Sequence, residues 1–345
     1  MNRITKYIKT TILLIASVIL AGCSASEDGY RKEIVINPDF LPVASFTASA
    51  TSITEGDSVT FTDTSTNNPT LWSWSLGGAD VTISNEQNVV AIYNVPGVYD
   101  VALKVRNDEG ANEIILEDFI TVEGKPIPYI SLYGFDSNLD DSGSNAITAV
   151  SNFGAPTYVE DRNSTASSAW ESPNTADNWL TIPGYKGISA DGTRTVMARF
   201  NTAAGTSRKT LVSWGTNASG KMFNVMLQGG QIRVEAGACS LRTSRTDLMD
   251  GKWHHVAVTF DPADGDKLSD AKVFIDGVLD ANLEDGPGKS YRSTTTIIDT
   301  DSNAEVRIGN SIYASNRYFF NGIIDDVAIL DVILIPEQIK AIAGE

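Results

Sequence analysis

Residues 251–261 read GKWHHVAVTFD, and this stretch decides the fold of the second half of the chain. Every second residue from Val256 to Phe260 is apolar and points inward, which is the pattern of a β-strand with one buried face. A second apolar run, 273–275, leads into Asp276-Gly277, a dipeptide that favours a tight hairpin turn. The stretch therefore predicts a strand and a hairpin of an all-β domain.

Similar segments recur on both sides of this hairpin. Predicted strands cover residues 195–200, 210–214, 223–227, 231–235, 253–260, 272–275, 305–308 and 323–330. Only 336–343 has helical spacing, with Pro336 in the first turn, where proline is favourable. So many short strands in one domain predict a sandwich or jelly roll over residues 128–345.

Three blocks of this region carry a family resemblance. The first is GKWHHVAVTFD, the second is VFIDGV at 273–278, and the third joins RIGN at 307–310 to FNGIIDDVAI at 320–329 and IPEQI at 335–339. In this order the blocks strongly resemble the laminin-G-like, concanavalin A-like superfamily. The resemblance implies a concanavalin A-like jelly-roll sandwich, in a superfamily whose members often bind sugars or proteins.

A smaller domain is predicted over residues 42–123. Its clearest strand runs from 98 to 106, where apolar residues alternate with Asp100, Lys104 and Arg106, and Pro96-Gly97 supplies the turn before it. The two prolines of KPIP at 125–128 make a stiff connector to the second domain. The smaller domain is therefore expected to be a β-sandwich.

Within this smaller domain, YNVPGVYDV at 93–101, SVTFTDTS at 58–65 and WSWSLGG at 72–78 resemble a PKD domain. The resemblance implies an immunoglobulin-like β-sandwich that acts as a spacer or adhesive module. The family's usual Gly-Asp-Gly turn is replaced at 76–80, so no ligand is assigned to that turn. Trp74 is expected to fill the space between the sheets.

The N-terminus predicts export and lipidation. Residues 1–22 combine a basic start with an apolar run, 11–20, that is too short to span a bilayer as a mature helix. The following LAGC at 20–23 resembles the lipobox of bacterial lipoproteins, which implies a lipid on Cys23. Residues 23–41 then form a polar tether. The alternative is an ordinary secretory signal with an incidental cysteine.

The residues after Cys23 predict where the protein is located, and the net charge of the chain limits its partners. The stretch SASED at 24–28 is similar to signals that place Bacteroidetes lipoproteins on the outer face of the outer membrane, so cell-surface location is expected. The net charge of −17 disfavours nucleic acid and anionic lipid as partners. The other cysteine is Cys239, and with lipid on Cys23 no disulfide forms within the chain.

A calcium site is the predicted metal site. The loop at 135–143 reads FDSNLDDSG and is rich in the oxygen ligands that Ca²⁺ prefers. In calcium-binding members of the resembled family such a loop meets an Asp-Asp pair near the end of the domain, which implies Asp136, Asp141 and Asp325 as ligands. A solvated acidic turn without metal is the alternative.

Sugar contacts are predicted from aromatic residues in polar, loop-like surroundings, because sugar rings stack on exposed aromatic side chains. The candidates are Trp170, Trp179, Tyr291, Tyr313 and Tyr318. For each of them the alternative is an ordinary packed aromatic. His254 and His255 are neighbours on one strand and point to opposite faces, so they are expected to be structural.

The predicted function is that of a cell-surface lipoprotein that binds a polysaccharide, or another surface glycan or protein, through its second domain. The alternative is a structural or protein-docking component of a surface complex. A glycoside hydrolase or polysaccharide lyase is disfavoured, because the Glu-x-Asp-x-Glu run that such sandwiches commonly carry is missing and Gln231-Ile232-Arg233 lacks a lyase histidine. The protein is therefore not expected to be an enzyme.

Overall fold

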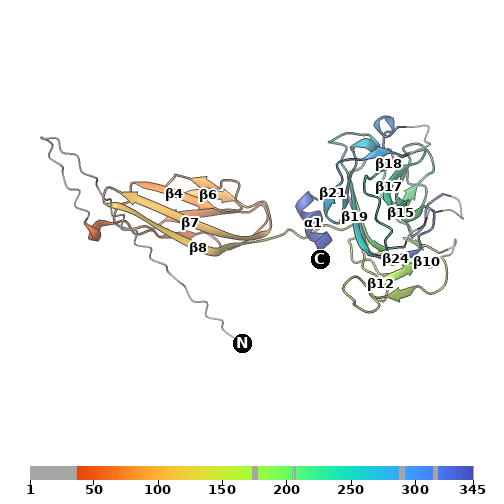
Figure 1. Cartoon of the computed structure of the whole chain (residues 1–345), viewed down its shortest axis with the longest axis horizontal. Helices are drawn as coiled ribbons and strands as arrows, with labels where there is room; N and C mark the ends of the chain where they lie inside the picture. Colours follow the sequence, from red (N-terminus) through yellow and green to blue (C-terminus); the bar gives the residue numbers. More distant parts are fainter. Residues whose placement is uncertain are drawn as a thin grey trace, which may run out of the picture. The chain divides into compact units, whose positions relative to one another are not determined.

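The computed structural model describes residues 37–172, 178–203, 205, 207–286, 292–313 and 318–344. The predicted signal peptide, Cys23 and nearly all of the tether lie outside the described residues. The chain divides between Glu123 and Gly124 into two compact units, and each is described by itself (Figure 1). In the part of the chain that the structure describes, no helix is long and apolar enough to cross a membrane.

The first unit is a sandwich of two sheets with strand orders β1-β3-β6 and β2-β8-β7-β4-β5. All pairs are antiparallel except β2 with β8, which are parallel. The elements are a 3₁₀ turn at Pro38–Phe40, β1 (Phe46–Ala48), β2 (Ser52–Thr54), β3 (Ser58–Asp63), β4 (Leu71–Leu76), β5 (Ile83–Ser84), β6 (Val89–Ile92), β7 (Gly97–Asn107) and β8 (Gly110–Glu123).

The core of the first unit is formed by the apolar residues that alternate with polar ones along its strands. Val101, Leu103 and Val105 of β7 are fully buried, which confirms the strand predicted at 98–106. Trp74 is 1% exposed and packs against the rings of Phe46 and Phe61, and its indole Nε1 donates to the carbonyl of residue 86 at 2.9 Å. Trp74 is a core residue, as expected.

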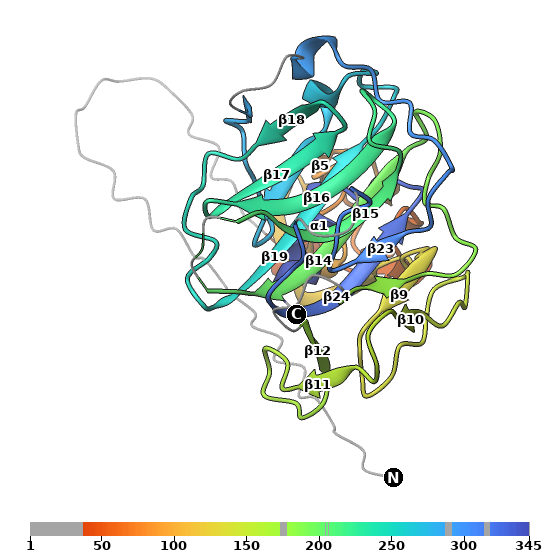
Figure 2. The same cartoon turned by 90° about the vertical axis from the view of Figure 1, so that its right-hand side faces the viewer.

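The second unit contains two eight-stranded sheets packed face to face (Figure 2). One has the order β10-β13-β23-β15-β16-β17-β18-β22, and the other has β11-β12-β24-β14-β19-β20-β21, with β9 also paired to β24. The strands are β9 (Ser131–Tyr133), β10 (Val150–Ser151), β11 (Thr157–Val159), β12 (Ala169–Ser172), β13 (Leu180–Thr181), β14 (Arg194–Asn201), β15 (Lys209–Gly215), β16 (Met222–Gln228), β17 (Gln231–Ala236), β18 (Cys239–Arg242), β19 (Trp253–Phe260), β20 (Lys272–Ile275), β21 (Val278–Leu279), β22 (Glu284–Asp285), β23 (Arg307–Ile308) and β24 (Gly322–Leu330).

Alternation along these strands builds the main core between the two sheets. Val256, Val258 and Phe260 of β19 and Ile232 and Val234 of β17 belong to this core. Helix α1 (Pro336–Gly344) packs on the outer face of the sheet that contains β19, where it covers a second, smaller apolar cluster. The jelly-roll prediction and the single predicted helix are therefore confirmed, and two 3₁₀ turns, Leu268–Asp270 and Ser293–Thr295, complete the elements.

The hairpin turn at Asp276-Gly277 is fixed by a polar network. The Asp276 carboxylate accepts hydrogen bonds from the backbone N–H of His255 at 2.9 Å and from Arg245 at 2.6 Å, and lies 3.0 Å from Nδ1 of His254. The hydrogen bond to Asp276 raises the pKa of His254, and the carboxylate of Asp250 adds to the effect. Burial raises the pKa of Asp276, yet its hydrogen bonds outweigh burial and leave that pKa low.

His255 behaves differently from its neighbour. Neither ring nitrogen has a hydrogen-bond partner among the described residues, and burial lowers the pKa of His255 to about 3. The imidazole is therefore neutral at physiological pH. The two histidines thus have separate environments, one in the turn network and one buried without a hydrogen-bond partner among the described residues.

We predict that Asp276→Asn removes a pH-dependent contribution to stability. A raised pKa of His254 stabilises the fold below about pH 6.5 and loses that effect as pH rises through the folded pKa, whereas the lowered pKa of Asp276 stabilises above about pH 4. Thermal unfolding should show the largest loss in the variant between these limits. Nuclear magnetic resonance titration should show the His254 pKa falling toward its ordinary value, and an unchanged titration would contradict the role given to Asp276.

Candidate functional site

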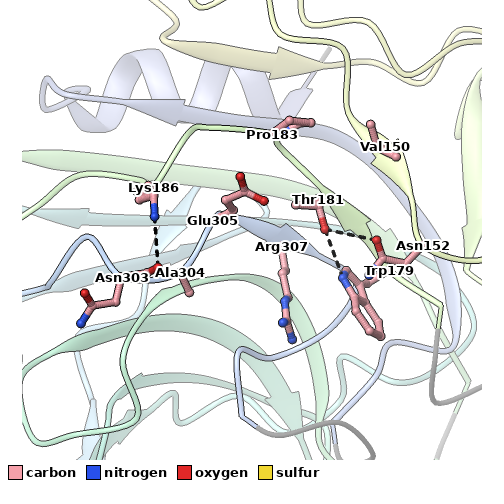
Figure 3. Close-up of a pocket in the computed structure, with 10 residues that line it drawn as sticks. All are labelled: Val150, Asn152, Trp179, Thr181, Pro183, Lys186, Asn303, Ala304, Glu305 and Arg307. Atoms are coloured by element: carbon pink, nitrogen blue, oxygen red, sulfur yellow. Dashed lines mark hydrogen bonds between the residues drawn. The ribbon is translucent and has the colours of Figure 1, made fainter.

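A cavity of roughly 600 Å³ opens in the second unit beside β10, β13 and β23 (Figure 3). This volume lies within the usual range of small-ligand sites. The lining side chains include an indole, amide and hydroxyl groups, two cations and a carboxylate, namely Trp179, Asn152, Thr181, Lys186, Arg307 and Glu305. The cavity thus combines a flat apolar surface with hydrogen-bonding groups of both kinds.

Strand pairing places the side chains of the cavity. Thr181 of β13 is in register with Arg307 of β23, which is in register with Ser213 of β15. The next residues along β13 and β23, Leu180 and Ile308, are fully buried in the core. Since successive side chains of a strand point to opposite faces, Thr181 and Arg307 must point away from the core.

Trp179 is held in place by polar contacts around its ring. Its indole Nε1 donates to the Thr181 hydroxyl at 3.2 Å, and that hydroxyl lies 3.5 Å from the Asn152 side-chain oxygen (Figure 3). The Arg307 guanidinium carbon lies 4.8 Å from the ring centroid, a cation–π contact. The ring is only partly buried, so an aromatic surface remains available in the cavity.

The charged groups of the cavity have few protein partners. Arg307 donates from Nη1 to the Ser311 carbonyl at 3.1 Å, and burial lowers the pKa of Arg307. Lys186 donates from Nζ to the carbonyl of Asn303 at 3.1 Å (Figure 3). Glu305 accepts from the backbone N–H of residue 184 at 2.8 Å. Neither cation is in an ion pair with a carboxylate of the described residues.

A second polar group lies on the same sheet, where β16, β17 and β18 pair. Glu235 is fully buried and forms ion pairs with Arg233 at 2.7 Å and with Arg208 at 3.2 Å. Arg233 Nη2 and the Asn224 side-chain oxygen are buried without a hydrogen-bond partner in the described parts of the chain. These groups are closed off, whereas the Trp179 cavity is open.

A further hollow, of about 470 Å³, belongs to the first unit. It lies beside β2 and the start of β3 and is lined by small and acidic residues, among them Asp57 and Glu123. Among the described residues that line it there is no aromatic side chain, so this lining lacks the stacking surface that a sugar site uses.

The aromatic residues predicted to contact sugar lie in different surroundings within the second unit. Trp179 lines the cavity. Trp170 is instead 1% exposed and packs on Phe135 in the core, because its strand β12 pairs with β24 and turns the ring inward; a ring so placed cannot meet a sugar. Tyr291 lies outside the described residues.

The two remaining predicted aromatics, Tyr313 and Tyr318, lie together away from this lining. Their ring centroids are 5.7 Å apart in an edge-to-face contact. The Tyr313 hydroxyl donates to the Gly237 carbonyl at 3.0 Å, and the Arg208 guanidinium lies 4.7 Å from the Tyr318 ring centroid. Both rings are partly buried.

Sequence reasoning did not single out Arg307, Lys186 or Asn152. A signal existed for Arg307, because it alternates with the apolar residues Val306 and Ile308 and must therefore face away from the core. Lys186 and Asn152 lie in connecting segments, where no periodic pattern assigns a direction to a side chain.

The predicted metal ligands fall into two places. Asp141 accepts hydrogen bonds from the backbone N–H groups of Leu132 at 2.7 Å and Gly143 at 2.8 Å, so it shapes its own loop. Asp325 is 3% exposed, and burial, with added repulsion from Asp326, raises its pKa to about 8. Asp136 is one of the further carboxylates that raise this pKa.

These carboxylates do not form a complete set of metal ligands. Within the described ranges no group of three or more His, Cys, Asp and Glu side chains is close enough to hold a metal ion. A buried carboxyl group with a raised pKa, such as Asp325, is nevertheless a group whose charged form a cation would favour. Calcium binding therefore stays a prediction.

Comparisons with known proteins agree with the two units. Residues 40–122 match the PKD domain family, and residues 174–340 match the concanavalin A-like lectin/glucanases superfamily. A search of curated proteins finds no significant match.

Several solved structures resemble parts of the chain. The binding domain of botulinum neurotoxin serotype D is 13% identical with a TM-score of 0.40, over 63% of this chain and 50% of the toxin domain. A Ruminococcus gnavus sialidase module, CBM40, bound to α2,3-sialyllactose is 17% identical with a TM-score of 0.36, over 48% of this chain and 96% of the module. The PKD1 domain of the Vibrio cholerae metalloprotease PrtV is 29% identical with a TM-score of 0.21, over 24% of this chain and 98% of that domain.

The chain spans about half the length of the toxin binding domains that it matches. Scores at this level do not identify a ligand. What the two family matches and the two sandwiches establish is the domain make-up: the chain carries a PKD domain followed by a concanavalin A-like domain.

Proposed function

We propose that the concanavalin A-like domain binds carbohydrate in the Trp179 cavity. The observation that carries the proposal is the partly exposed indole of Trp179 in a cavity of roughly 600 Å³ that also presents Asn152 and Thr181. Sugars offer apolar C–H faces that pack on an aromatic ring and hydroxyls that need both donors and acceptors. The cavity supplies the aromatic ring through Trp179, and hydrogen-bond donors and acceptors through Asn152 and Thr181.

The fixed position of Trp179 supports binding of a rigid ring. Because the indole N–H is already satisfied by Thr181, the ring has no polar requirement that a ligand must meet. Thr181 lies in β13 and Asn152 directly follows β10, and these two strands pair with each other in the sheet. A surface that is already ordered costs less entropy on binding.

In this proposal the domain binds carbohydrate without hydrolysing it. Canonical glycoside hydrolysis uses two carboxyl groups on either side of the scissile bond. Glu305 is the one carboxylate in the described lining of the cavity, and it accepts a backbone hydrogen bond. A sugar held there would therefore meet a binding surface with a single acid.

We also propose that the protein is a lipid-anchored surface protein. The support is the LAGC sequence that ends in Cys23, followed by an acidic stretch at 26–28. In this proposal the PKD domain is a spacer that holds the binding domain away from the membrane. The net charge of −17 would favour repulsion from anionic headgroups over adhesion to them.

We predict that Trp179→Ala weakens binding to whichever polysaccharide of a panel the full chain retains, by about tenfold or more, because the stacking surface is lost. Trp179→Phe should keep most of the affinity. Phe40→Ala is the matched control, since Phe40 is a 59% exposed aromatic of the first unit. Affinity electrophoresis and calorimetry measure the effect, and equal binding by wild type and Trp179→Ala would exclude the cavity.

Lipidation is tested separately. Labelled fatty acid should enter the wild-type chain and fail to enter Cys23→Ser, because the thiol is the group that takes the lipid. Cys239→Ser is the matched control, since Cys239 is the only other cysteine and is buried. Equal labelling of wild type and Cys23→Ser would end the lipoprotein proposal.

The proposed calcium site predicts an effect on stability. Without metal, the raised pKa of Asp325 makes the free energy of unfolding fall as pH rises from about 4 to about 8, because in this range the folded state keeps a proton that the unfolded state releases. Bound calcium requires the ionised carboxylate, so it should oppose this fall. Asp325→Asn should flatten the pH profile and abolish the response to calcium.

Thermal unfolding with calcium or with a chelator, across this pH range, measures both effects. Asp331→Asn is the control, because Asp331 is an exposed acid of the same unit. If Asp325→Asn flattens the profile while calcium and chelator change nothing, Asp325 is a buried structural acid and the metal site is excluded.

A further inference from the structure

We propose that the sugar bound in the Trp179 cavity is acidic and that Arg307 binds its carboxylate. This inference rests on the proposed function, because it names the class of sugar that the same cavity takes. It is carried by the guanidinium of Arg307, which has no ion pair with a carboxylate of the described residues and lies against the Trp179 ring, and by Lys186, the second cation that lines the cavity.

Arg307 differs from the other arginines of its unit. Seven of the arginines that the structure describes there have a carboxylate within ion-pair distance, namely Arg162, Arg199, Arg208, Arg233, Arg242, Arg245 and Arg292. An eighth, Arg194, is satisfied by the carbonyls of residues 190 and 192 and by the Thr300 hydroxyl. Arg307 is the ninth, and a single carbonyl accepts from it.

Arg307 has hydrogen-bond donors that the protein does not use. The side chain is partly buried, burial lowers its pKa, and no carboxylate of the described residues lies within ion-pair distance of it. A guanidinium has five N–H donors arranged as a planar fork that fits a carboxylate with two parallel bonds. With one donor used on Ser311, the rest of the fork has no acceptor in the described part of the chain.

The position of the Arg307 guanidinium indicates that one sugar residue carries both the stacked ring and the acidic group. Arg307 lines the cavity, and its guanidinium lies 4.8 Å from the ring centroid of Trp179 (Figure 3). The guanidinium lies over one face of the indole, so a pyranose that packs on the part of the ring left exposed lies in the same cavity as the fork, and an acidic substituent of that sugar can be directed toward it. One sugar residue can then use both groups.

The other charges of the cavity favour an anion. Lys186 adds a second cation and is exposed, with a backbone carbonyl as its acceptor. Glu305 is the opposing acid, and its carboxylate accepts from the backbone N–H of residue 184 instead of pairing with either cation. The lining is thus positive by one charge in a chain of net charge −17. Long-range repulsion is screened at physiological salt, so this local charge decides which ligand is favoured.

The experiment compares each acidic glycan with a neutral counterpart. The full chain is titrated with polygalacturonate and with the same polymer after reduction of its carboxyl groups, and with sialyllactose and lactose. The polymer pair tests a uronic acid and the lactose pair tests a sialic acid. We expect the chain to bind the acidic member of at least one pair about tenfold more tightly.

Arg307→Gln should remove this preference by weakening the acidic member more than the neutral member, which also contacts the cavity that Arg307 lines. Arg307→Lys should keep part of the preference, because charge remains without the planar fork. Lys104→Gln is the control, an exposed cation of the first unit. Thermal unfolding establishes that each variant is folded.

The outcomes separate the two proposals. Equal binding of acidic and neutral members, with loss of both in Trp179→Ala, overturns the acidic ligand and keeps the carbohydrate site. A preference for acid that survives in Arg307→Gln overturns the role of Arg307. Absence of binding to every glycan of the set, and to the wider panel, overturns the carbohydrate site and the inference with it.

Discussion

The pairing of β24 in the middle of its sheet is the constraint on which the second unit depends. β24 is bonded to β14 on one side and to β12 and β9 on the other, so the last strand joins segments that are far apart in the sequence. This pairing sets one wall of the main core, and the facing sheet must then turn Leu180 and Ile308 inward. The cavity residues Thr181 and Arg307 point away from the core as a direct result of that packing.

The fold could be predicted wherever strands are long enough to show alternation. The predicted strands at 195–200, 223–227 and 253–260 are all present as β14, β16 and β19, each extended or matched within a residue or two. The strands β10 and β13 have two residues each, too few for a period to be visible, and their positions come from partners distant in sequence. The direction of Trp170 was missed for the same reason, since pairing of the short β12 with β24 turns it into the core.

The candidate site was less predictable than the fold. Trp179 could be proposed because an aromatic residue in polar surroundings is conspicuous in a sequence, whereas Lys186 and Asn152 gain a role only when β10, β13 and β23 meet. For the acidic pair of β24, strict alternation is interrupted by a shift of register opposite Met197 and Arg199, and Asp326 has a φ of +46°. The faces of Asp325 and Asp326 therefore could not be read from spacing alone.

The central position of β24 also bears on how the protein is made. A ribosome releases β14, β19 and most of the facing sheet before it releases Gly322–Leu330, and until then β12 and β14 lack the strand that lies between them. The open edges of an unfinished sheet are sites where other chains can pair. Such a domain cannot complete its core in step with synthesis, so it must be kept from self-association until its last strand is available.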